Sequence, residues 1–163
     1  VENRILDDVV CELDEQEALG LNEIELFKGR KAETLAALER CMVQRTCKAG
    51  EKIFRRGDTG DELFLIRRGA VRIMLPISEK QNHHLGTFGR GAFFGEMAFL
   101  DGDVRSADAV AFSDTELYVL SRKTFNLLAE SHKMLALGLM EGIASVLASR
   151  LRYTNAELRV LES

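Results

Sequence analysis

The residues with the clearest chemical potential lie together in one short segment of the chain. Gly95 is followed at once by Glu96 and by enough residues for one helical turn. A helix that begins directly after a glycine presents free backbone N–H groups to an anion. Arg105 follows, with a guanidinium fork that suits phosphate oxygens. Ser106 and the N–H group of Ala107 can add hydrogen-bond donors, so the segment predicts a phosphate cradle.

Glu96 does not fit a phosphate site by itself, because like charges repel. Its presence is explained if the ligand also carries a sugar hydroxyl. The carboxylate would then accept a hydrogen bond from a ribose 2′-OH while Arg105 holds the phosphate, and the pair would recognise a ribose and a phosphate in fixed relation, as in a cyclic nucleotide. The alternative is that Glu96 and Arg105 simply form an ion pair that closes the loop.

The elements that must position these groups fit in one domain with accessory helices, because the chain has 163 residues. Hydrophobic residues make up 46% and charged residues 29%, which is ordinary globular composition and excludes wholesale disorder. No run of about 18 apolar residues is present, so neither a membrane span nor a signal peptide is expected. Cys11, Cys41 and Cys47 lack metal-ligand spacing and indicate free thiols in a reducing, cytoplasmic compartment.

The net charge of −4 is unevenly distributed along the chain. Residues 1–26 hold nine acidic residues and a single base, Arg4, so this segment carries −8 and the remainder carries +4. An acidic face disfavours non-specific binding of nucleic acid, whereas the mildly basic remainder could attract a small anion. The acids could equally do no more than solvate a helix surface.

Three parts follow one another along the chain: an N-terminal helical segment, residues 1–42; a β-rich core, residues 43–121; and C-terminal helices, residues 122–163. The spacing of apolar residues predicts helices over residues 1–19 and 31–42. From Val43 onward, short apolar runs alternate with glycines, which is typical of an antiparallel sandwich or barrel. The predicted fold class is therefore α+β, mainly β: an antiparallel β-sandwich or jelly-roll barrel flanked by helices at both ends.

Seven strands are predicted in the β-rich core. A turn at Gly69 reverses the chain, and Pro76 inside a predicted strand indicates either an edge strand or a bulge. The predicted strands cover residues 43–48, 52–55, 62–67, 70–77, 83–88, 106–112 and 115–120.

The C-terminal part reads as two helices. Ser121 is the expected N-cap of a first helix, residues 122–130, and Ser131 the expected N-cap of a longer one. Apolar residues recur every three to four positions over about five turns of the longer helix. A helix of that length could leave the β-rich core and find a partner, or it could pack only on its own domain.

Three stretches, in order, resemble consecutive motifs of one known family. Residues 48–58 resemble its opening strands, residues 63–73 its glycine-centred hairpin, and residues 94–100 with 105–107 its phosphate-binding cassette. The β-rich core thus resembles a cyclic-nucleotide-binding domain, the module of the bacterial catabolite activator protein, the regulatory subunit of protein kinase A and nucleotide-gated channels. The flanking helices also fit the layout of this family, in which the C-terminal helix acts as a lid.

The resemblance implies a role for each matching residue. Arg105 would bind the exocyclic phosphate oxygens and Glu96 the ribose 2′-OH, while an apolar side chain on the helix at residues 132–150 would cover the base. The implied ligand-binding residues are Gly95, Glu96, Met97, Ala98, Arg105, Ser106 and Ala107 around the phosphate and sugar, and Ile73, Leu85 and Gly86 around the purine.

The identity of the base is less constrained than the ligand class. A hydroxyl directly after the arginine, here Ser106, occurs in both cAMP-selective and cGMP-selective relatives, and the bacterial character of the sequence favours cAMP over cGMP. Asp108 departs from the expected chemistry. If its side chain points inward it would repel phosphate, and strand alternation makes an outward orientation equally compatible with the sequence.

Other functions fit less well. A cupin-like metal site needs two histidines on one strand face, whereas His83 and His84 are adjacent and point to opposite faces. No Ser–His–Asp set is identifiable, so we expect no enzyme, no metal and no cofactor besides cAMP or cGMP as ligand. A module that has lost ligand binding and serves structure or dimerisation remains an alternative. So does the sensor domain of a truncated transcription factor, although no DNA-reading motif precedes the last residue, Ser163.

The tail at residues 148–159 is similar to the C-termini of bacterial proteins in which this domain follows a STAS domain, including sulfate-permease-type transporters and some glutaminases. The resemblance implies that the chain is the cytoplasmic sensor of a larger protein, and a protein anchored in a membrane is one such parent. Binding of a cyclic nucleotide would move the C-terminal helix over the base, and the helix position, or a homodimer formed through that helix, would be the output.

Overall fold

The computed structural model describes residues 9–10, 12–13 and 16–163, and the statements below concern this part of the chain. The helix predicted over residues 1–19 lies largely outside the described residues, although 9–10 and 12–13 are helical. Residues 16–20 are not helical, so the prediction that this helix continues to Gly20 is wrong.

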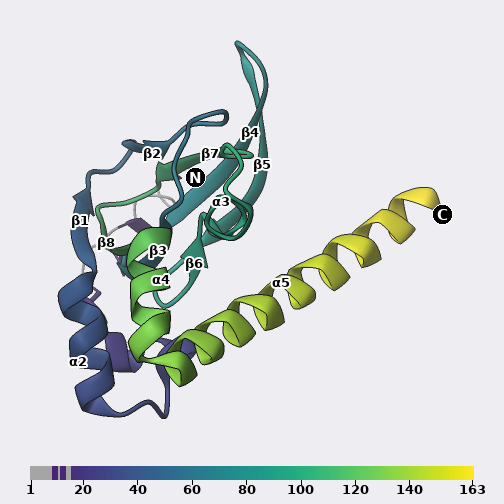
Figure 1. Cartoon of the computed structure of the whole chain (residues 1–163). Helices are drawn as coiled ribbons and strands as arrows, with labels where there is room; N and C mark the ends of the chain where they lie inside the picture. The colour runs from purple at the N-terminus through teal and green to yellow at the C-terminus, as the bar shows by residue number, and fades with distance from the viewer. Residues whose placement is uncertain (1–8, 11, 14–15) are drawn as a thin grey trace.

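Within the described residues, eight strands form two antiparallel sheets (Figure 1). The first sheet has the order β1 (Val43–Cys47), β8 (Thr115–Leu120), β3 (Leu63–Arg68) and β6 (Phe93–Phe94). The second has the order β2 (Lys52–Phe54), β7 (Asp108–Ala111), β4 (Val71–Ser78) and β5 (Gln81–Phe88). Residues of both sheets share one buried apolar cluster. The predicted α+β class and β-sandwich architecture are therefore confirmed.

The strand that sequence patterning missed is β6, Phe93–Phe94, which pairs with Phe64 and Leu65 of β3. Two residues are too few to show an alternating pattern. The strand predicted over residues 106–112 is shorter than expected and covers Asp108–Ala111.

The continuous apolar run in β3 is explained by burial on both of its faces. Phe64 and Ile66 lie in the cluster between the two sheets, whereas Leu63 and Leu65 lie in a second cluster formed with the helices. All four side chains are at most 4% exposed. The helices thus cover the outer face of the first sheet, so β3 connects the helical layer to the interior of the sandwich.

Pro76 lies in an edge segment and beside a register shift, so both alternatives that the sequence left open apply. The pairing of β4 with β7 ends at Met74, so the outer half of β4, where Pro76 pairs with Asn82, has a neighbour only in β5. The register also shifts between Pro76 and Ser78. The missing N–H group of proline therefore costs no ladder hydrogen bond on the β7 side. This outer half extends as a hairpin beyond the body of the domain (Figure 1).

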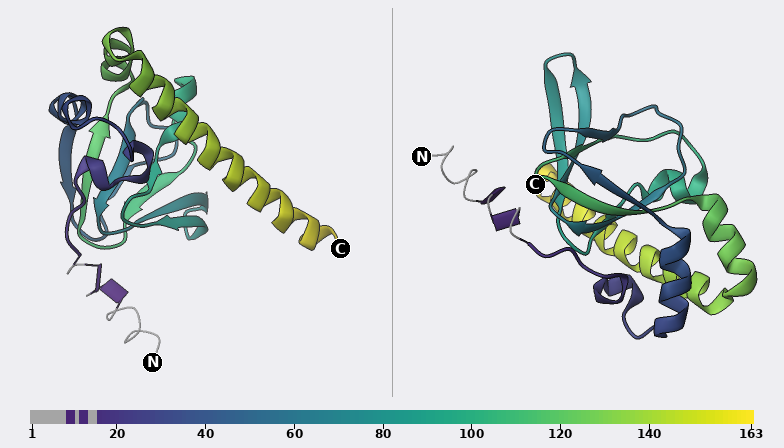
Figure 2. Two further views of the ribbon diagram at one scale, coloured as in Figure 1. Left: turned by 90° about the horizontal axis from the view of Figure 1, so that it is seen from below. Right: turned by 90° about the vertical axis from the view of Figure 1, so that its left-hand side faces the viewer.

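The helical layer consists of short 3-10 turns and longer helices that pack on the first sheet (Figure 2). The elements are η1 (Leu21–Glu23), η2 (Glu25–Phe27), α2 (Ala32–Cys41), α4 (Arg122–Ser131) and α5 (Lys133–Glu162). The helix predicted over residues 31–42 corresponds to α2. One further helix, α3 (Glu96–Asp101), lies between β6 and β7 along the chain.

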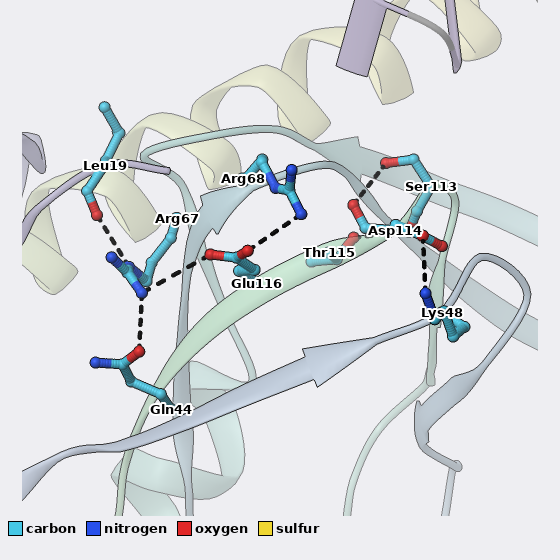
Figure 3. A network of polar contacts seen from close by, with 9 residues as sticks. All are labelled: Leu19, Gln44, Lys48, Arg67, Arg68, Ser113, Asp114, Thr115 and Glu116. Carbon is cyan, nitrogen blue, oxygen red and sulfur yellow. Dashed lines mark hydrogen bonds and ion pairs between the residues drawn. The ribbon is translucent and has the colours of Figure 1, made fainter. Parts of the chain in front are cut away.

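A polar network ties the N-terminal segment to the first sheet (Figure 3). Arg67 donates from Nε to the carbonyl of Leu19 at 3.0 Å and from Nη1 to Oε1 of Gln44 at 2.9 Å. Glu116 lies 3.1 Å from Nη2 of Arg68 and 3.8 Å from Nη1 of Arg67. Side chains of β1, β3 and β8 thus fix where the chain enters the domain.

The two predicted helix caps have different outcomes. Ser121 caps α4 as predicted, because its hydroxyl accepts a hydrogen bond from the N–H of Thr124 at 3.1 Å. The prediction for Ser131 is wrong. Ser131 is the last residue of α4, its Oγ lies 2.9 Å from Nδ1 of His132, and α5 begins after His132 without a side-chain cap. An N-cap needs a non-helical backbone, which a residue inside the preceding helix cannot offer.

The cap assignment can be tested with a matched pair of substitutions. We expect Ser121→Ala to lower the free energy of unfolding by about 1 kcal/mol, because the N–H of Thr124 loses its partner. Ser131→Ala should have a clearly smaller effect, since that hydroxyl caps no helix. Urea denaturation followed by circular dichroism measures both, and equal losses for the two variants would contradict the assignment.

Helix α5 combines the two alternatives left open by the sequence. Its first half packs on the domain through Leu135, Leu139 and Ile143, whereas residues 151–163 are exposed and the C-terminal end of the helix extends away from the domain (Figures 1 and 2). By length and composition α5 could also cross a membrane, contrary to the expectation from the sequence, and 22% of its apolar window is buried. Core helices of soluble proteins can have the same length and composition, so one such helix is weak evidence for a membrane span.

The two cysteines among the described residues are free thiols, as predicted, and Cys11 lies outside that part of the chain. Cys41 is exposed and Cys47 is buried. Burial, with Glu51 nearby, raises the pKa of the Cys47 thiol to about 11. This thiol is therefore protonated at neutral pH and has the low reactivity of a core residue.

Candidate functional site

A cavity of about 720 Å³ lies between the second sheet, the segment around α3, and α5. This volume is in the range of small-molecule sites, roughly 300–1,000 Å³. The structure brings all of the residues predicted to bind a ligand to this one cavity: Ile73, Leu85, Gly86, Gly95, Glu96, Met97, Ala98, Arg105, Ser106 and Ala107. Leu85 and Met97 are each 53% exposed and form part of its outer rim.

Gly95 sets the start of α3 at the edge of the cavity. Its φ of +77° is in the left-handed region, which suits glycine. A side chain at this position would also collide, because a Cβ atom would lie 2.9 Å from Nη1 of Arg105 and 3.1 Å from the carbonyl of Glu62. Ala98 and Phe99 are buried and anchor the helix in the domain. The first turn of α3 therefore faces the cavity, as predicted.

Arg105 lines the cavity and is only 3% exposed. Nη1 donates to the carbonyl of Gly95 at 3.0 Å, and Nη2 contacts the carbonyl and Oε2 of Glu62 at 3.1 and 3.0 Å. The guanidinium carbon is 4.4 Å from the ring centre of Phe54 and 5.5 Å from that of Phe64. These contacts hold the cation in a fixed orientation.

The burial of Arg105 carries an electrostatic cost. Desolvation lowers the pKa of its guanidinium, and the carboxylate of Glu62 opposes this shift. Because an arginine remains protonated in proteins, the buried guanidinium keeps its charge at a cost in free energy. A bound anion would further stabilise this charge. The backbone is fixed as well, since the N–H of Arg105 donates to Asp58 and its carbonyl accepts from Gly57. Glu62 was not among the residues expected from the sequence.

Glu96 and Arg105 do not form the ion pair that the sequence left open as an alternative. Instead Oε1 of Glu96 lies 3.2 Å from Nη1 of Arg150 on α5, and Arg105 pairs with Glu62. Glu96 and Arg105 nevertheless line the same cavity. The carboxylate and the guanidinium are thus held apart by separate partners, with the cavity open to both.

Asp108 points away from the cavity, which resolves the departure noted in the sequence. Its side chain is buried, Oδ1 accepts from the N–H of Arg56 at 2.7 Å, and Oδ2 lies 3.3 Å from Nζ of Lys52. It does not line the cavity. The carboxylate stabilises the neighbouring strand β2 and its turn, and does not oppose an anion beside Arg105.

Sequence reasoning missed several lining residues. They are Phe54 of β2, Thr87 and Phe88 of β5, Phe94 of β6, and Leu147, Ser149, Arg150, Leu151, Tyr153 and Thr154 of α5. Leu147 falls in the range where an apolar cover was predicted, but Leu151 and Tyr153 lie beyond it. Residues 147, 150, 151 and 154 have the i, i+3, i+4, i+7 spacing of one helix face. That spacing could have predicted them, had it been applied to polar as well as apolar side chains.

Comparison with known proteins agrees with this geometry. Residues 44–132, more than half of the chain, match the family model described as cyclic nucleotide-binding domain. The chain therefore belongs to the cyclic nucleotide-binding domain family, and the resemblance inferred from the sequence motifs is confirmed.

Two curated relatives illustrate the contexts in which similar chains occur. Glutaminase 1 of Bradyrhizobium diazoefficiens is 36% identical over 151 residues, which are 93% of this chain and 24% of that protein. The Cyclic AMP receptor protein of Thermus thermophilus is 36% identical over 136 residues, which are 83% of this chain and 61% of that protein. The chain thus spans about a quarter of the first relative and three fifths of the second.

Solved structures show the same fold. The crystal structure of the Thermus thermophilus catabolite activator protein superposes with a TM-score of 0.71 at 36% identity, covering 84% of this chain and 62% of that one. A cyclic nucleotide-binding domain from Methylobacillus flagellatus superposes with a TM-score of 0.74 at 27% identity, covering 94% and 82%. The jelly-roll fold with flanking helices is therefore shared with both.

Proposed function

We propose that this chain is a regulatory domain that binds a 3′,5′-cyclic nucleotide, cAMP in preference to cGMP, and transmits its occupancy through α5 to a longer protein. The observation that carries the proposal is the placement of Arg105 and Glu96 on one cavity of about 720 Å³, each held by a different partner. A buried cation can hold the cyclic phosphate, and a separate carboxylate can accept the ribose hydroxyl.

The remaining walls suit the rest of such a ligand. The backbone N–H groups at the start of α3 and the Ser106 hydroxyl are donors for phosphate oxygens. Ile73 and Leu85 offer an apolar surface for the purine, and Leu147 and Leu151 of α5 approach from the opposite wall. The preference for cAMP rests on the similarity to a relative named Cyclic AMP receptor protein.

Helix α5 is the proposed output element, because it lines the cavity and then continues away from the domain. A ligand shifts the position of the helix only as far as it binds one position more tightly than the other. The exposed second half also carries apolar side chains, including Leu158, Val160 and Leu161, that are 52–82% exposed. We propose that this half contacts the rest of the parent protein or a second copy of the chain.

The parent protein is proposed to be a cytoplasmic enzyme of the glutaminase type or a transporter with a STAS domain, the chain itself carrying no catalysis. Support comes from Glutaminase 1, which matches 93% of the chain. A transcriptional regulator is the competing parent, because the N-terminal domain of one from Streptomyces coelicolor superposes on 85% of the chain at 25% identity with a TM-score of 0.68.

Calorimetric titration tests the proposed ligand. We expect cAMP to bind with a stoichiometry of one per chain, cGMP to bind more weakly, and 5′-AMP, which lacks the cyclic diester, to bind far more weakly still. A thermal melt with each nucleotide gives an independent measure, because a ligand that binds only the folded state raises the melting temperature. Absence of both heat and stabilisation with either cyclic nucleotide would favour a module that serves structure alone. Tighter binding of cGMP would refute only the proposed base preference.

A further inference from the structure

Arg150 of α5 makes both hydrogen bonds and aromatic contacts with the cavity wall, which an apolar side chain covering the base could not make. Nη1 lies 3.2 Å from Oε1 of Glu96, and Nη2 donates to the carbonyl of Phe93 at 3.0 Å. The guanidinium carbon is 4.4 Å from the ring centre of Phe88 and 4.9 Å from that of Phe93. A single side chain thus connects α5 to β5, β6 and the first residue of α3.

These contacts fix the orientation of the Glu96 carboxylate. The side chain of Glu96 is 13% exposed and that of Arg150 is 28% exposed, so both are largely shielded from water. The described hydrogen bond to Arg150 uses Oε1 of Glu96. The planar guanidinium is itself held by the Phe93 carbonyl, so it cannot rotate freely. Oε2 is consequently available to accept a hydrogen bond from a ligand.

Arg150 also changes the electrostatics of the cavity. A carboxylate close to a phosphate opposes binding, because two negative charges repel in a partly dehydrated site. The guanidinium of Arg150, 3.2 Å from Glu96, offsets the charge of this carboxylate, whereas the charge of Arg105 is paired with Glu62. Glu96 can therefore read a hydroxyl group with a smaller penalty for the adjacent anion.

We propose that Arg150 is a positioning residue for ribose recognition: it acts through Glu96, and it makes discrimination for the 2′-hydroxyl depend on α5. This inference rests on the proposed binding of a cyclic nucleotide and adds to it. Without Arg150 the carboxylate loses its orientation and its counter-charge, so the energetic advantage of a ligand with a 2′-OH falls. The helix that carries the output then takes part directly in reading the sugar.

The test compares cAMP with 2′-deoxy-cAMP, which lacks the hydroxyl that Glu96 would accept. Dissociation constants for both ligands are measured by calorimetry on the wild-type chain, Arg150→Ala, Arg150→Lys and Arg152→Ala. Arg152 is exposed, does not line the cavity and serves as the matched control. Thermal melts without ligand establish that each variant folds.

We expect the wild-type chain to prefer cAMP over 2′-deoxy-cAMP by roughly tenfold or more, as for a hydrogen bond to a charged group. Arg150→Ala should reduce this preference to about threefold or less, chiefly by weakening cAMP. Arg150→Lys should recover part of the preference, because it keeps a positive charge near Glu96. Arg152→Ala should leave both constants unchanged.

Other results would overturn the inference. If Arg150→Ala weakens both ligands by the same factor, Arg150 is only a structural tie between α5 and the domain. If it strengthens cAMP binding, Arg150 competes with the ribose for Glu96. Equal binding of the two ligands by the wild-type chain would show that Glu96 does not read the hydroxyl. Lack of any cAMP binding by the wild-type chain would instead refute the proposed function itself.

Discussion

Binding of cAMP is expected to weaken roughly tenfold to a hundredfold when Arg105 is replaced by methionine, while the chain remains folded. The lost contacts are charge-assisted hydrogen bonds to phosphate, each worth about 1.5–3 kcal/mol. Methionine preserves much of the side-chain volume between Phe54 and Phe64, and it removes a buried charge that was costly to dehydrate. Glu62, whose side chain is 41% exposed, can be hydrated once its partner is gone. The measurement is calorimetric titration with cAMP beside a thermal melt.

Arg122→Met is the matched control for that substitution. Arg122 also lies near two aromatic rings, 5.4 Å from those of Phe99 and Phe125, and donates to the carbonyl of Phe99 at 3.0 Å. It does not line the cavity. Loss of stability without loss of cAMP affinity is therefore expected. Arg105→Lys should fall between wild type and Arg105→Met, because lysine keeps the charge but not the fork. Unchanged affinity in Arg105→Met would remove Arg105 from the site.

The parts of the fold that the sequence predicted are those encoded locally. Glycine-punctuated apolar runs predicted the sandwich, and Pro76 predicted either an edge strand or a bulge, because each depends on backbone chemistry at one place. The phosphate-binding segment was also predictable, since Gly95 and Arg105 lie within one turn-rich stretch. Strand β6 could not be predicted, because a strand of two residues, Phe93 and Phe94, shows no alternating pattern and is defined only by its pairing with β3.

The parts of the site that the sequence did not predict depend on long-range partners. Glu62 is 43 residues from Arg105 in the chain, and Arg150 is 54 residues from Glu96. From the sequence alone, a charged residue on a helix is expected to lie on the solvated surface, and only the fold shows which counter-charge it meets. The apolar periodicity of α5 extends to Leu147 and Leu151, which line the cavity, but it gives no indication of the role of Arg150 beside them. The sequence therefore predicted which residues would contact a ligand, but it did not predict the partners, Glu62 and Arg150, that hold them in place.

The second large effect is expected from Gly95→Ala, compared with Gly102→Ala. Both glycines flank α3 with positive φ, +77° and +72°, so alanine strains the backbone at each by about 1–2 kcal/mol. They differ in what a side chain would meet. A Cβ at Gly102 has nothing within 4 Å, whereas a Cβ at Gly95 lies 2.9 Å from Nη1 of Arg105 and 3.1 Å from Cδ2 of Phe64.

We therefore expect both variants to lower the melting temperature, with the larger loss for Gly95→Ala, and only Gly95→Ala to weaken cAMP, by tenfold or more. The strain on α3 is common to the two, so any difference in affinity reports the displacement of Arg105 and of the helix start. Equal affinities in calorimetric titration would mean that the cation tolerates being pushed aside, and that its hydrogen bond to the Gly95 carbonyl does not orient it for phosphate. A loss of affinity in Gly102→Ala as large as in Gly95→Ala would instead mean that the order of α3 as a whole limits binding, since the added methyl group there touches no other residue.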